Sequence, residues 1–417
     1  MSKNKKLVPK RRFNRFEKDK QWFIEKLSSF AEFSKGNGYS KNDLCEQGLP
    51  ILLYGRLYTQ YETIIRSVDT FIINKKDSTV FSSGDEVVVP ASGETAKDIA
   101  RASFIHKSGI IIGGDLNIIK PKDKVISHFL AISLSSGDQK KELIKRAQGK
   151  TVVHLHNSEL KDIKFIFPTI KEQTQIGEFF KKLDDLIQTQ QKKLEKTKTL
   201  KSAYLAEMFP CDGELKPHYR FQCFNEVWTK NLFYNLANIR RGLTYNPSHL
   251  TNDGIRILRS SNIDEDRFII KDDDIFINEK NVNIPVVSEN DVLITAANGS
   301  SRLVGKHALI SLPKSQKAVH GGFMLLATSK QPFFTNALLS SNWYRKFLNV
   351  YIAGGNGSIG NLNKKTIENQ LIKIPSTKEQ TKIGNFFKLL DKKIALEQRK
   401  LEKLNNIKQA YLNEMFV

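Results

Sequence analysis

Residues 168–209 read PTIKEQTQIGEFFKKLDDLIQTQQKKLEKTKTLKSAYLAEMF, and residues 375–416 read PSTKEQTKIGNFFKLLDKKIALEQRKLEKLNNIKQAYLNEMF. The two stretches lie at a constant offset of 207 residues and are identical at 25 of 42 positions without a gap. Self-similarity at a fixed spacing indicates an internal repeat. We therefore expect two related halves, each ending in the same segment.

The repeated segment is predicted to be a long helix. In the first copy Pro168 ends a strand-like run, and Thr169 with Glu172 three residues later matches a capping box; Ser376 and Glu379 repeat it in the second. Apolar residues then recur at spacings of three and four, which is a heptad seam. The seam residues are Ile176, Phe180, Leu183, Ile187, Leu194, Tyr204 and Met208, then Ile383, Phe387, Leu390, Ile394, Leu401, Leu404, Tyr411 and Met415.

Two arrangements of these helices are possible. Each helix can pack on its own domain, or the two can pack on each other, and a seam of about five heptads favours the coiled coil. A helix from Gln173 to Met208 would be ~54 Å long, more than a compact domain usually covers. Because the first helix leads into the second half and the second starts there, a packed pair must be antiparallel. Gln190 and Glu397 hold equivalent central positions and are expected to face each other at a pseudo-twofold axis.

The predicted fold class is α+β, with two mixed α/β domains held apart by the antiparallel helix pair. The predicted segments are 1–167 and 211–374 for the domains and 168–210 and 375–417 for the helices. Upstream of the helices the halves share Pro9, Arg12, Phe13, Trp22, Ala31 and Gly36 with Pro217, Arg220, Phe221, Trp228, Ala237 and Gly242. Between these ends they differ, and ILLYGRLYTQYET at 51–63 is expected to have no counterpart. A constant frame around a variable middle predicts one architecture that recognises two different targets.

Charge indicates the kind of partner. Lysine and arginine total 66 against 44 acidic residues, a net charge of +22 with a pI near 9.6. The electric field of such a positive chain favours a polyanionic partner, and nucleic acid is the first candidate. The alternative is a generically basic protein without such a partner. No apolar run is long enough for a membrane span, and the basic N-terminus lacks a signal-peptide core. Three scattered cysteines fit a reducing cytoplasm.

Motifs for chemistry are missing from the sequence. It has no methyltransferase N-P-P-Y tetrad, no H-E-x-x-H and no G-x-S-x-G. Gly299 to Gly305-Lys306 resembles a phosphate loop, but its spacing is five and His307 replaces the hydroxyl residue. His154 and His156 alternate as on a strand, without a second ligand pair, so no metal site is expected. We therefore predict no catalytic residue and no cofactor in this chain.

Loops with basic, amide or hydroxyl side chains are the candidates for DNA contact. Arginine can bind guanine and asparagine adenine through two hydrogen bonds, and serine or threonine can bind phosphate. For each candidate alone, a solvated turn is the alternative interpretation. The candidates are Arg56, Tyr58, Thr59, Ser92, Thr95, Lys97, Arg101 and Lys150 in the first half, and Arg240, Arg241, Arg259, Ser260, Asn262, Asn298, Ser300, Arg302 and Lys306 in the second.

The repeated K-E-Q-T-x-I-G-x-F-F-x-x-L-D stretch, ending in A-Y-L-x-E-M-F, resembles the conserved regions of type I restriction-modification specificity subunits. So does P-K-R-R-F near the start. LPILLYGRLYT at 49–59 is similar to one class of target-recognition domain, and GIRILRSSNI at 254–263 to another. The resemblance covers essentially the whole chain.

This resemblance implies a non-catalytic subunit whose two target-recognition domains read the halves of a bipartite site on double-stranded DNA, with no membrane. The helices would act as a spacer and dock two methyltransferase subunits, with off-seam residues such as Leu205 and Leu412 facing them. S-adenosylmethionine, ATP and magnesium would serve those subunits and the restriction subunits. Two alternatives remain: a methyltransferase with fused specificity domains, disfavoured by the missing tetrad, and a non-restriction coiled-coil scaffold that binds nucleic acid.

Overall fold

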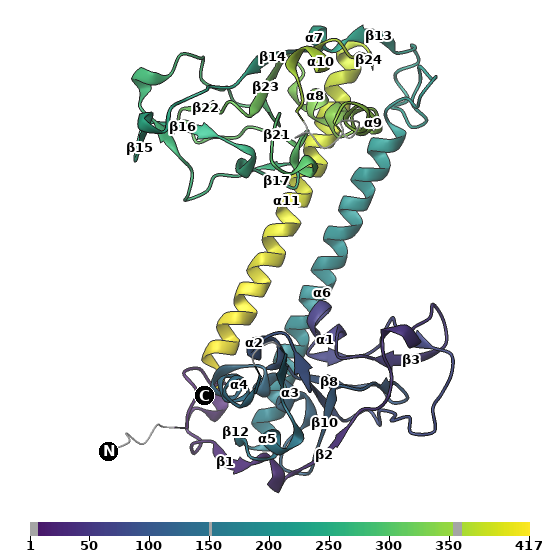
Figure 1. Ribbon diagram of the computed structural model, residues 1–417, viewed down its shortest axis with the longest axis vertical. Coiled ribbons are helices and arrows are strands. Elements are labelled where there is room, and N and C mark those ends of the chain that lie inside the picture. The colour runs from purple at the N-terminus through teal and green to yellow at the C-terminus, as the bar shows by residue number, and fades with distance from the viewer. Residues whose placement is uncertain (1–6, 150–151, 353–360) are drawn as a thin grey trace. The chain divides into compact units, whose positions relative to one another are not determined.

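The computed structural model describes residues 7–149, 152–352 and 361–417. The chain forms two compact units: unit 1 comprises residues 1–191 and 400–417, and unit 2 comprises 192–399. The division passes through both long helices, α6 (Ile170–Glu207) and α11 (Thr377–Glu414), which are labelled in Figure 1. Each unit therefore holds most of one repeated helix and the end of the other. No helix among the described residues is long and apolar enough to span a membrane.

Unit 1 is built on a five-stranded sheet of order β2-β10-β6-β8-β4. Its strands are β2 (Ala31–Lys35), β10 (Leu116–Pro121), β6 (Val87–Pro90), β8 (Ser103–Ile105) and β4 (Ile64–Ile65). The run Val87 to Pro90 is buried throughout, as expected for a strand covered on both faces. The helices α3 (Ser127–Leu134) and α4 (Gly137–Arg146) follow the sheet in the chain and pack on each other.

A smaller sheet extends unit 1, and its strands are β3 (Leu49–Leu52), β5 (Phe71–Ile72) and β9 (Ile111–Ile112). Next to α6 a short antiparallel pair joins the two ends of the domain, β1 (Phe23–Lys26) and β12 (Lys164–Phe167), with α5 (Asn157–Lys161) just before β12. The main core combines Trp22, Phe129, Phe165 and Phe180 with Phe416, which lies two residues beyond the end of α11.

Unit 2 repeats this plan. Its main sheet has the order β14-β23-β20-β21, with β14 (Ala237–Arg241), β23 (Met324–Ser329), β20 (Val292–Thr295) and β21 (His307–Leu309). The second sheet contains β15 (Leu250–Thr251), β19 (Phe276–Ile277), β16 (Ile255–Leu258) and β22 (Ala318–His320). The remaining matching elements are α8 (Pro332–Leu339), α9 (Asn342–Tyr351), α10 (Lys364–Glu368), β13 (Thr229–Leu232) and β24 (Leu371–Ile374).

The strand at the start of the stretch 51–63 has a structural counterpart in unit 2, so the expectation that this stretch is unmatched is wrong for its strand. Its strand β3 pairs in parallel with β9, and β16 pairs in parallel with β22 in the same way. Gly48 and Gly254 precede these strands with φ of +147° and +129°, a region open to glycine. A Cβ atom would lie 2.2 Å from the Ile72 carbonyl oxygen at Gly48 and 2.5 Å from that of Ile277 at Gly254. The backbones agree while most side chains differ, which concealed the match in the sequence.

A buried ion pair explains the arginine shared by the starts of the halves. Arg12 donates from Nε and Nη2 to the two carboxylate oxygens of Glu172, both at 2.7 Å. Arg220 binds Glu379 with the same two distances in unit 2. These carboxylates, expected to form capping boxes, are instead held by the arginines, and both glutamates are almost fully buried.

In unit 1 the last turns of α11 run antiparallel along the start of α6. The rings of Phe179 and Tyr411 are 4.9 Å apart, and further along Lys408 forms an ion pair with Asp184. Phe416 then enters the core beside Phe180, with centroids 5.9 Å apart. The end of this helix therefore completes the core of the first domain.

Unit 2 holds the equivalent contacts with the helices exchanged. Tyr204 lies 4.9 Å from Phe386, and Lys201 forms an ion pair with Asp391 at 2.7 Å. The expectation that Leu205 faces a partner is wrong, whereas Leu412 is only half-buried. Leu205 is buried in the unit 2 core and Leu412 packs on the unit 1 core, because the helix ends serve the domains.

Candidate nucleic-acid interface

In unit 1 the candidate interface forms where the chain leaves the central strand β6. Residues after it make the short strand β7 (Ser92–Gly93), followed by α2 (Ala96–Ile99). Ser92 pairs with His154 of β11 (Val153–His154), the segment that follows Lys150 and Thr151. The backbone nitrogen of Leu155 donates to the carbonyl of Ala91 at 3.0 Å. Two distant stretches of the variable region are thus joined at one edge.

Four candidates from the first half meet at this edge. The Tyr58 hydroxyl, from α1 (Arg56–Thr59), donates to the Ser92 carbonyl. Arg101 donates to the Leu57 carbonyl at 3.3 Å and pairs with Asp98, whose backbone N–H in turn donates to Thr95 at 3.1 Å. Burial raises the pKa of Tyr58 far above its usual range, so the tyrosine remains a hydrogen-bond donor.

A cluster of cations lies beside this group. The pKa of Lys140, on α4, is lowered chiefly by burial and further by the nearby charges of Arg101 and Lys97. Mutual repulsion of this kind is relieved when a phosphate approaches. Lys140 was missed in the sequence, because nothing in α4 marks one lysine from its neighbours. Lys150 lies outside the described residues.

The remaining candidates of the first half are less available. Arg56 binds both Asp69 and Glu62, so two carboxylates already neutralise its charge. The hydroxyl of Thr59 donates at 3.1 Å to the carbonyl of Gly55, the residue just before its own short helix.

Unit 2 presents the equivalent edge after β20. Ala297 forms a bridge with Asn361, and the Leu362 nitrogen donates to Ala296 at 2.7 Å, matching Leu155 and Ala91 in unit 1. The Asn298 amide donates to the Ser260 hydroxyl at 3.0 Å, which links this loop to the turn after β16. The structure therefore brings Asn298 and Ser260 together. Arg241, at the end of β14, is exposed, and so are Ser300 and Arg302 in the segment that follows β20.

Other candidates of the second half are engaged in the fold. The Asn262 side chain is fully buried and donates to Ile269 and Asp274. Arg240 pairs with the buried carboxylate of Asp291 at 3.3 Å, and Arg259 donates to the Asp273 carbonyl at 3.1 Å. Lys306 is half-buried after β20. Hydrogen bonds inside the fold are not visible as loop composition, which is why the sequence did not separate these residues from exposed ones.

Two exposed residues at this edge escaped the sequence analysis. Phe323 is 74% exposed on the turn between β22 and β23. Its carbonyl accepts from the nitrogens of Ala296 and Ala297 at 2.8 and 3.1 Å, which places it beside Asn298. A Cβ on the preceding Gly322 would lie 3.3 Å from the hydroxyl of Thr244, which is also exposed. The signal in the sequence was the Gly-Gly pair before an aromatic residue.

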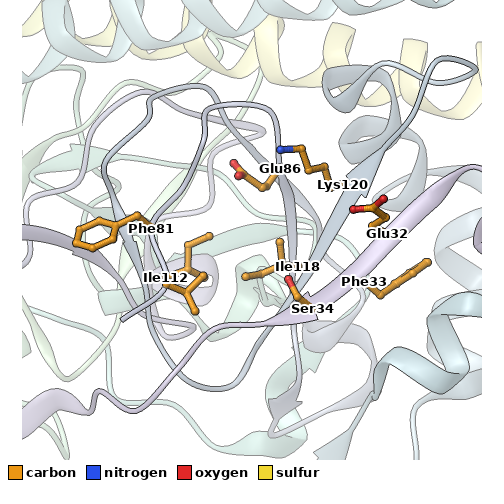
Figure 2. A pocket seen from close by; sticks show the side chains of 9 residues that line it. Glu32, Phe33, Ser34, Phe81, Glu86, Ile112, Ile118 and Lys120 are labelled. Atoms are coloured by element: carbon orange, nitrogen blue, oxygen red, sulfur yellow. The ribbon is translucent and has the colours of Figure 1, made fainter. Parts of the chain in front are cut away.

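A cavity of about 220 Å³ in unit 1 is a candidate for a catalytic site. Figure 2 shows Glu86 and Lys120 above an apolar wall that includes Phe81 and Ile112. The Glu86 carboxylate accepts from the backbone nitrogens of Ser83 and Gly84 at 2.6 and 3.1 Å. Lys120 donates to the Ser83 hydroxyl at 3.0 Å. Both charged groups hold the loop 83–86, and none of the lining residues is a histidine or cysteine.

One group of potential metal ligands occurs among the described residues: Cys211, Glu214 and His218, all exposed. The His218 ring lies between Glu214 at 3.2 Å and Glu207 at 3.4 Å. These carboxylates, Glu214 first, raise the pKa of His218 and favour its protonated form, which cannot bind a metal. In unit 1 the glutamate equivalent to Glu207 is Glu414, and it also pairs with a cation, Arg11, so we interpret His218 as an ion-pair residue.

The protein contains two equivalent domains. Each has an exposed edge of polar loops, and each is followed by one copy of the repeated helix. These features define a duplicated recognition protein. A profile described as "Type I restriction modification DNA specificity domain" matches residues 19–198 and 235–406. The chain therefore belongs to the type I restriction-modification DNA specificity domain family, as a specificity subunit.

Similarity to individual proteins extends over the whole length. The chain is 22% identical to the EcoKI specificity subunit of Escherichia coli K12, over 95% of this chain and 88% of that one. It is 21% identical to the MjaVIII specificity subunit of Methanocaldococcus jannaschii, over 94% and 91%. The crystal structure of a type I S subunit from M. genitalium superposes with a TM-score of 0.66 at 16% identity, covering 98% and 99%. These findings confirm the expected family and the mixed two-domain repeat.

Proposed function

We propose that the two units each read one half of a bipartite site on double-stranded DNA, through the loop edges after β6 and β20. The observation that carries this proposal is a shared backbone position with different side chains. The hydrogen bonds of Leu155 to Ala91 and of Leu362 to Ala296 fix the same edge in both units. Around it unit 1 presents Tyr58 and Arg101, whereas unit 2 presents Asn298 and Ser260. One frame with two sets of donors and acceptors suits two different base sequences.

The proposed contact surface is narrower than the initial set of candidates. In unit 1 it contains Thr95, Lys97, Arg101 and Lys140, with Tyr58 as support. In unit 2 it contains Arg241, Thr244, Ser260, Asn298, Ser300, Arg302 and Phe323. The net charge of +22 supplies attraction to phosphates, which gives affinity without sequence preference.

The two repeated helices are proposed to form the spacer between the readers, as an antiparallel pair with pseudo-twofold symmetry. The support is that equivalent contacts recur in each unit: Lys408 with Asp184, and Lys201 with Asp391. If this register continues inward, the proposed axis would lie near residues 192 and 399, about two residues beyond Gln190 and Glu397. These two polar residues would then flank the axis rather than meet on it.

The chain is proposed to be non-catalytic and to recruit its enzymes. Two methyltransferase subunits using S-adenosylmethionine, and restriction subunits using ATP and magnesium, would join the symmetric helix pair. One solved relative, with a TM-score of 0.53 at 14% identity, is described as a type I system studied for complex assembly.

Methylome sequencing of a host with and without this gene, beside its methyltransferase gene, tests the proposal. We expect a bipartite methylated motif that disappears with the gene. Purified chain should also prefer a duplex carrying that motif over a scrambled one at fixed salt, and overall affinity should fall steeply as salt rises. Equal affinity for both duplexes would support the nucleic-acid scaffold instead.

A further inference from the structure

The turn that carries Phe323 in unit 2 has an equivalent turn in unit 1. The residue at the tip is apolar in unit 2 and acidic in unit 1. We infer that this tip is a base-reading position, at which Phe323 contacts the methyl group of a thymine and Asp115 accepts a hydrogen bond from the amino group of a cytosine or adenine. The inference rests on the proposed DNA-reading function and deepens it by naming the chemical groups that are read.

Backbone hydrogen bonds establish the equivalence. The Asp115 carbonyl accepts from the nitrogen of Ala91 at 2.7 Å, and the Phe323 carbonyl accepts from the nitrogen of Ala296 at 2.8 Å. Ala91 and Ala296 are the residues that define the proposed edge in each unit. Both tips are therefore attached to the edges proposed to face DNA.

Close backbone packing fixes the turn from its other side. A Cβ on Gly36 would lie 2.0 Å from the Gly113 carbonyl oxygen, and one on Gly242 would lie 1.9 Å from that of Gly321. Only glycine permits these approaches. The tips are thus held on a rigid backbone in both units, as a residue that discriminates between bases requires.

Phe323 is an exposed apolar side chain on a turn bound to a polar loop. At 74% exposure it buries little area in this unit, and its carbonyl accepts from Ala297, the residue before Asn298. Burying such a ring against another surface recovers hydrophobic free energy. In the major groove of DNA the thymine methyl is the apolar group that distinguishes one base pair from another, and phenylalanine suits it.

Asp115 shows the opposite pattern. It is exposed and has φ of +59°, a left-handed conformation that is uncommon for residues other than glycine but is adopted by aspartate and asparagine. A carboxylate close to DNA phosphates is repelled unless it receives a hydrogen bond. The exocyclic amino groups of cytosine and adenine are the donors in the major groove that can supply it. The two readers thus place different base preferences at one equivalent position.

The test uses the full chain and duplexes carrying its methylated motif, with each thymine of the unit 2 half-site replaced singly by deoxyuridine, which lacks the methyl. For the unaltered chain, one replacement should weaken binding about fourfold, the effect of one buried methyl-sized group. Phe323→Ala should weaken binding to the thymine duplex by at least as much and should be insensitive to that replacement. Asp115→Ala should relax one cytosine or adenine position of the other half-site only.

Leu371→Ala is the matched control, since Leu371 is also an exposed apolar residue of unit 2 but lies on β24. It should bind every duplex as the unaltered chain does. The inference is overturned if Phe323→Ala binds normally. It is also overturned if, relative to the unaltered chain, this variant is weakened by the same factor on the thymine duplex and on every deoxyuridine duplex. A half-site with no thymine on either strand would overturn it as well. Failure of the unaltered chain to prefer its motif over a scrambled duplex would instead overturn the proposed function itself.

Discussion

Buried charged residues make each unit sensitive to single substitutions. Glu379 is almost fully buried and both its oxygens depend on Arg220. Arg220→Ala should therefore lower the free energy of unfolding of unit 2 by about 3–5 kcal/mol, because it leaves a buried carboxylate unpaired. Replacing both residues with methionine should recover most of that loss. Chemical denaturation measures both, and Lys346→Ala, which breaks an exposed pair with Asp212, should leave the stability nearly unchanged.

A buried histidine makes the stability of unit 2 depend on pH. Burial lowers the pKa of His320 from 6.5 to about 4. The unfolded chain therefore binds more protons, and His320 contributes stability above pH 6.5 that is lost as the pH falls towards 4. At pH 5 the loss is about 2 kcal/mol at 1.36 kcal/mol per pH unit. His320→Gln should reduce the difference between urea unfolding curves measured at pH 7 and pH 5. An unchanged difference would contradict this prediction.

Sequence alone identified many important residues without their roles. Arg12 and Arg220 stood out as matched positions, but their buried glutamate partners lie about 160 residues away. For Asn262, the amide composition was right for DNA contact, yet tertiary packing uses that amide inside the fold. Phe323 carries no polar group and was not considered, since exposure depends on how the turn is held.

At the scale of elements, the repeated helices were predicted closely, because their heptad pattern is local. Their starts at Ile170 and Thr377 follow directly on the expected caps. What the pattern did not reveal is that Ile176 and Ile383 pack into the domain cores. The counterpart of 51–63 was missed for the opposite reason: its short strands are specified by pairing with distant strands.

The glycine near the start of each repeated helix offers a test of how tightly the helix packs on its domain. A Cβ on Gly384 would lie 2.7 Å from the backbone nitrogen of Phe334, whereas one on Gly177 would lie 3.1 Å from the ring of His128. Gly384→Ala should thus cost about 1–3 kcal/mol from overpacking. Gly177→Ala should be close to neutral, because the gain in helix propensity of about 1 kcal/mol offsets a milder clash. Thermal unfolding compares the two variants. Equal midpoints would show that α8 can move away from the added methyl group at little cost.

At the scale of the whole molecule, the duplicated frame predicts independent readers. Exchanging residues 36–150 for the same region of another such subunit should change one half of the methylated motif and leave the other half intact. The measurement is methylome sequencing of hosts that carry each chimera. A change in both halves would mean that the readers are coupled, contrary to the two separate contact edges.

The proposed spacer predicts a dependence of the motif on helix length. Deleting 190–196 and 397–403 keeps the heptad phase and shortens the pair by ~10 Å at 1.5 Å per residue. Since base pairs rise about 3.4 Å, the gap between half-sites should shrink by about three base pairs. Inserting four residues in each helix, about 6 Å, should lengthen it by one or two. An active variant with an unchanged gap would show that the helices do not set the spacing.

The end of α11 in the core of unit 1 also sets the order in which the protein can be finished on the ribosome. Unit 2 is continuous in sequence, so its own residues suffice once they have been synthesised. Unit 1 is begun first, yet Phe416, which packs against Trp22 and Phe129, is translated only after the whole of unit 2. At about 5–20 residues per second, residues 192–416 take roughly 11 to 45 s to make. During that interval the first domain waits with an open core, and a chain that stops early never closes it.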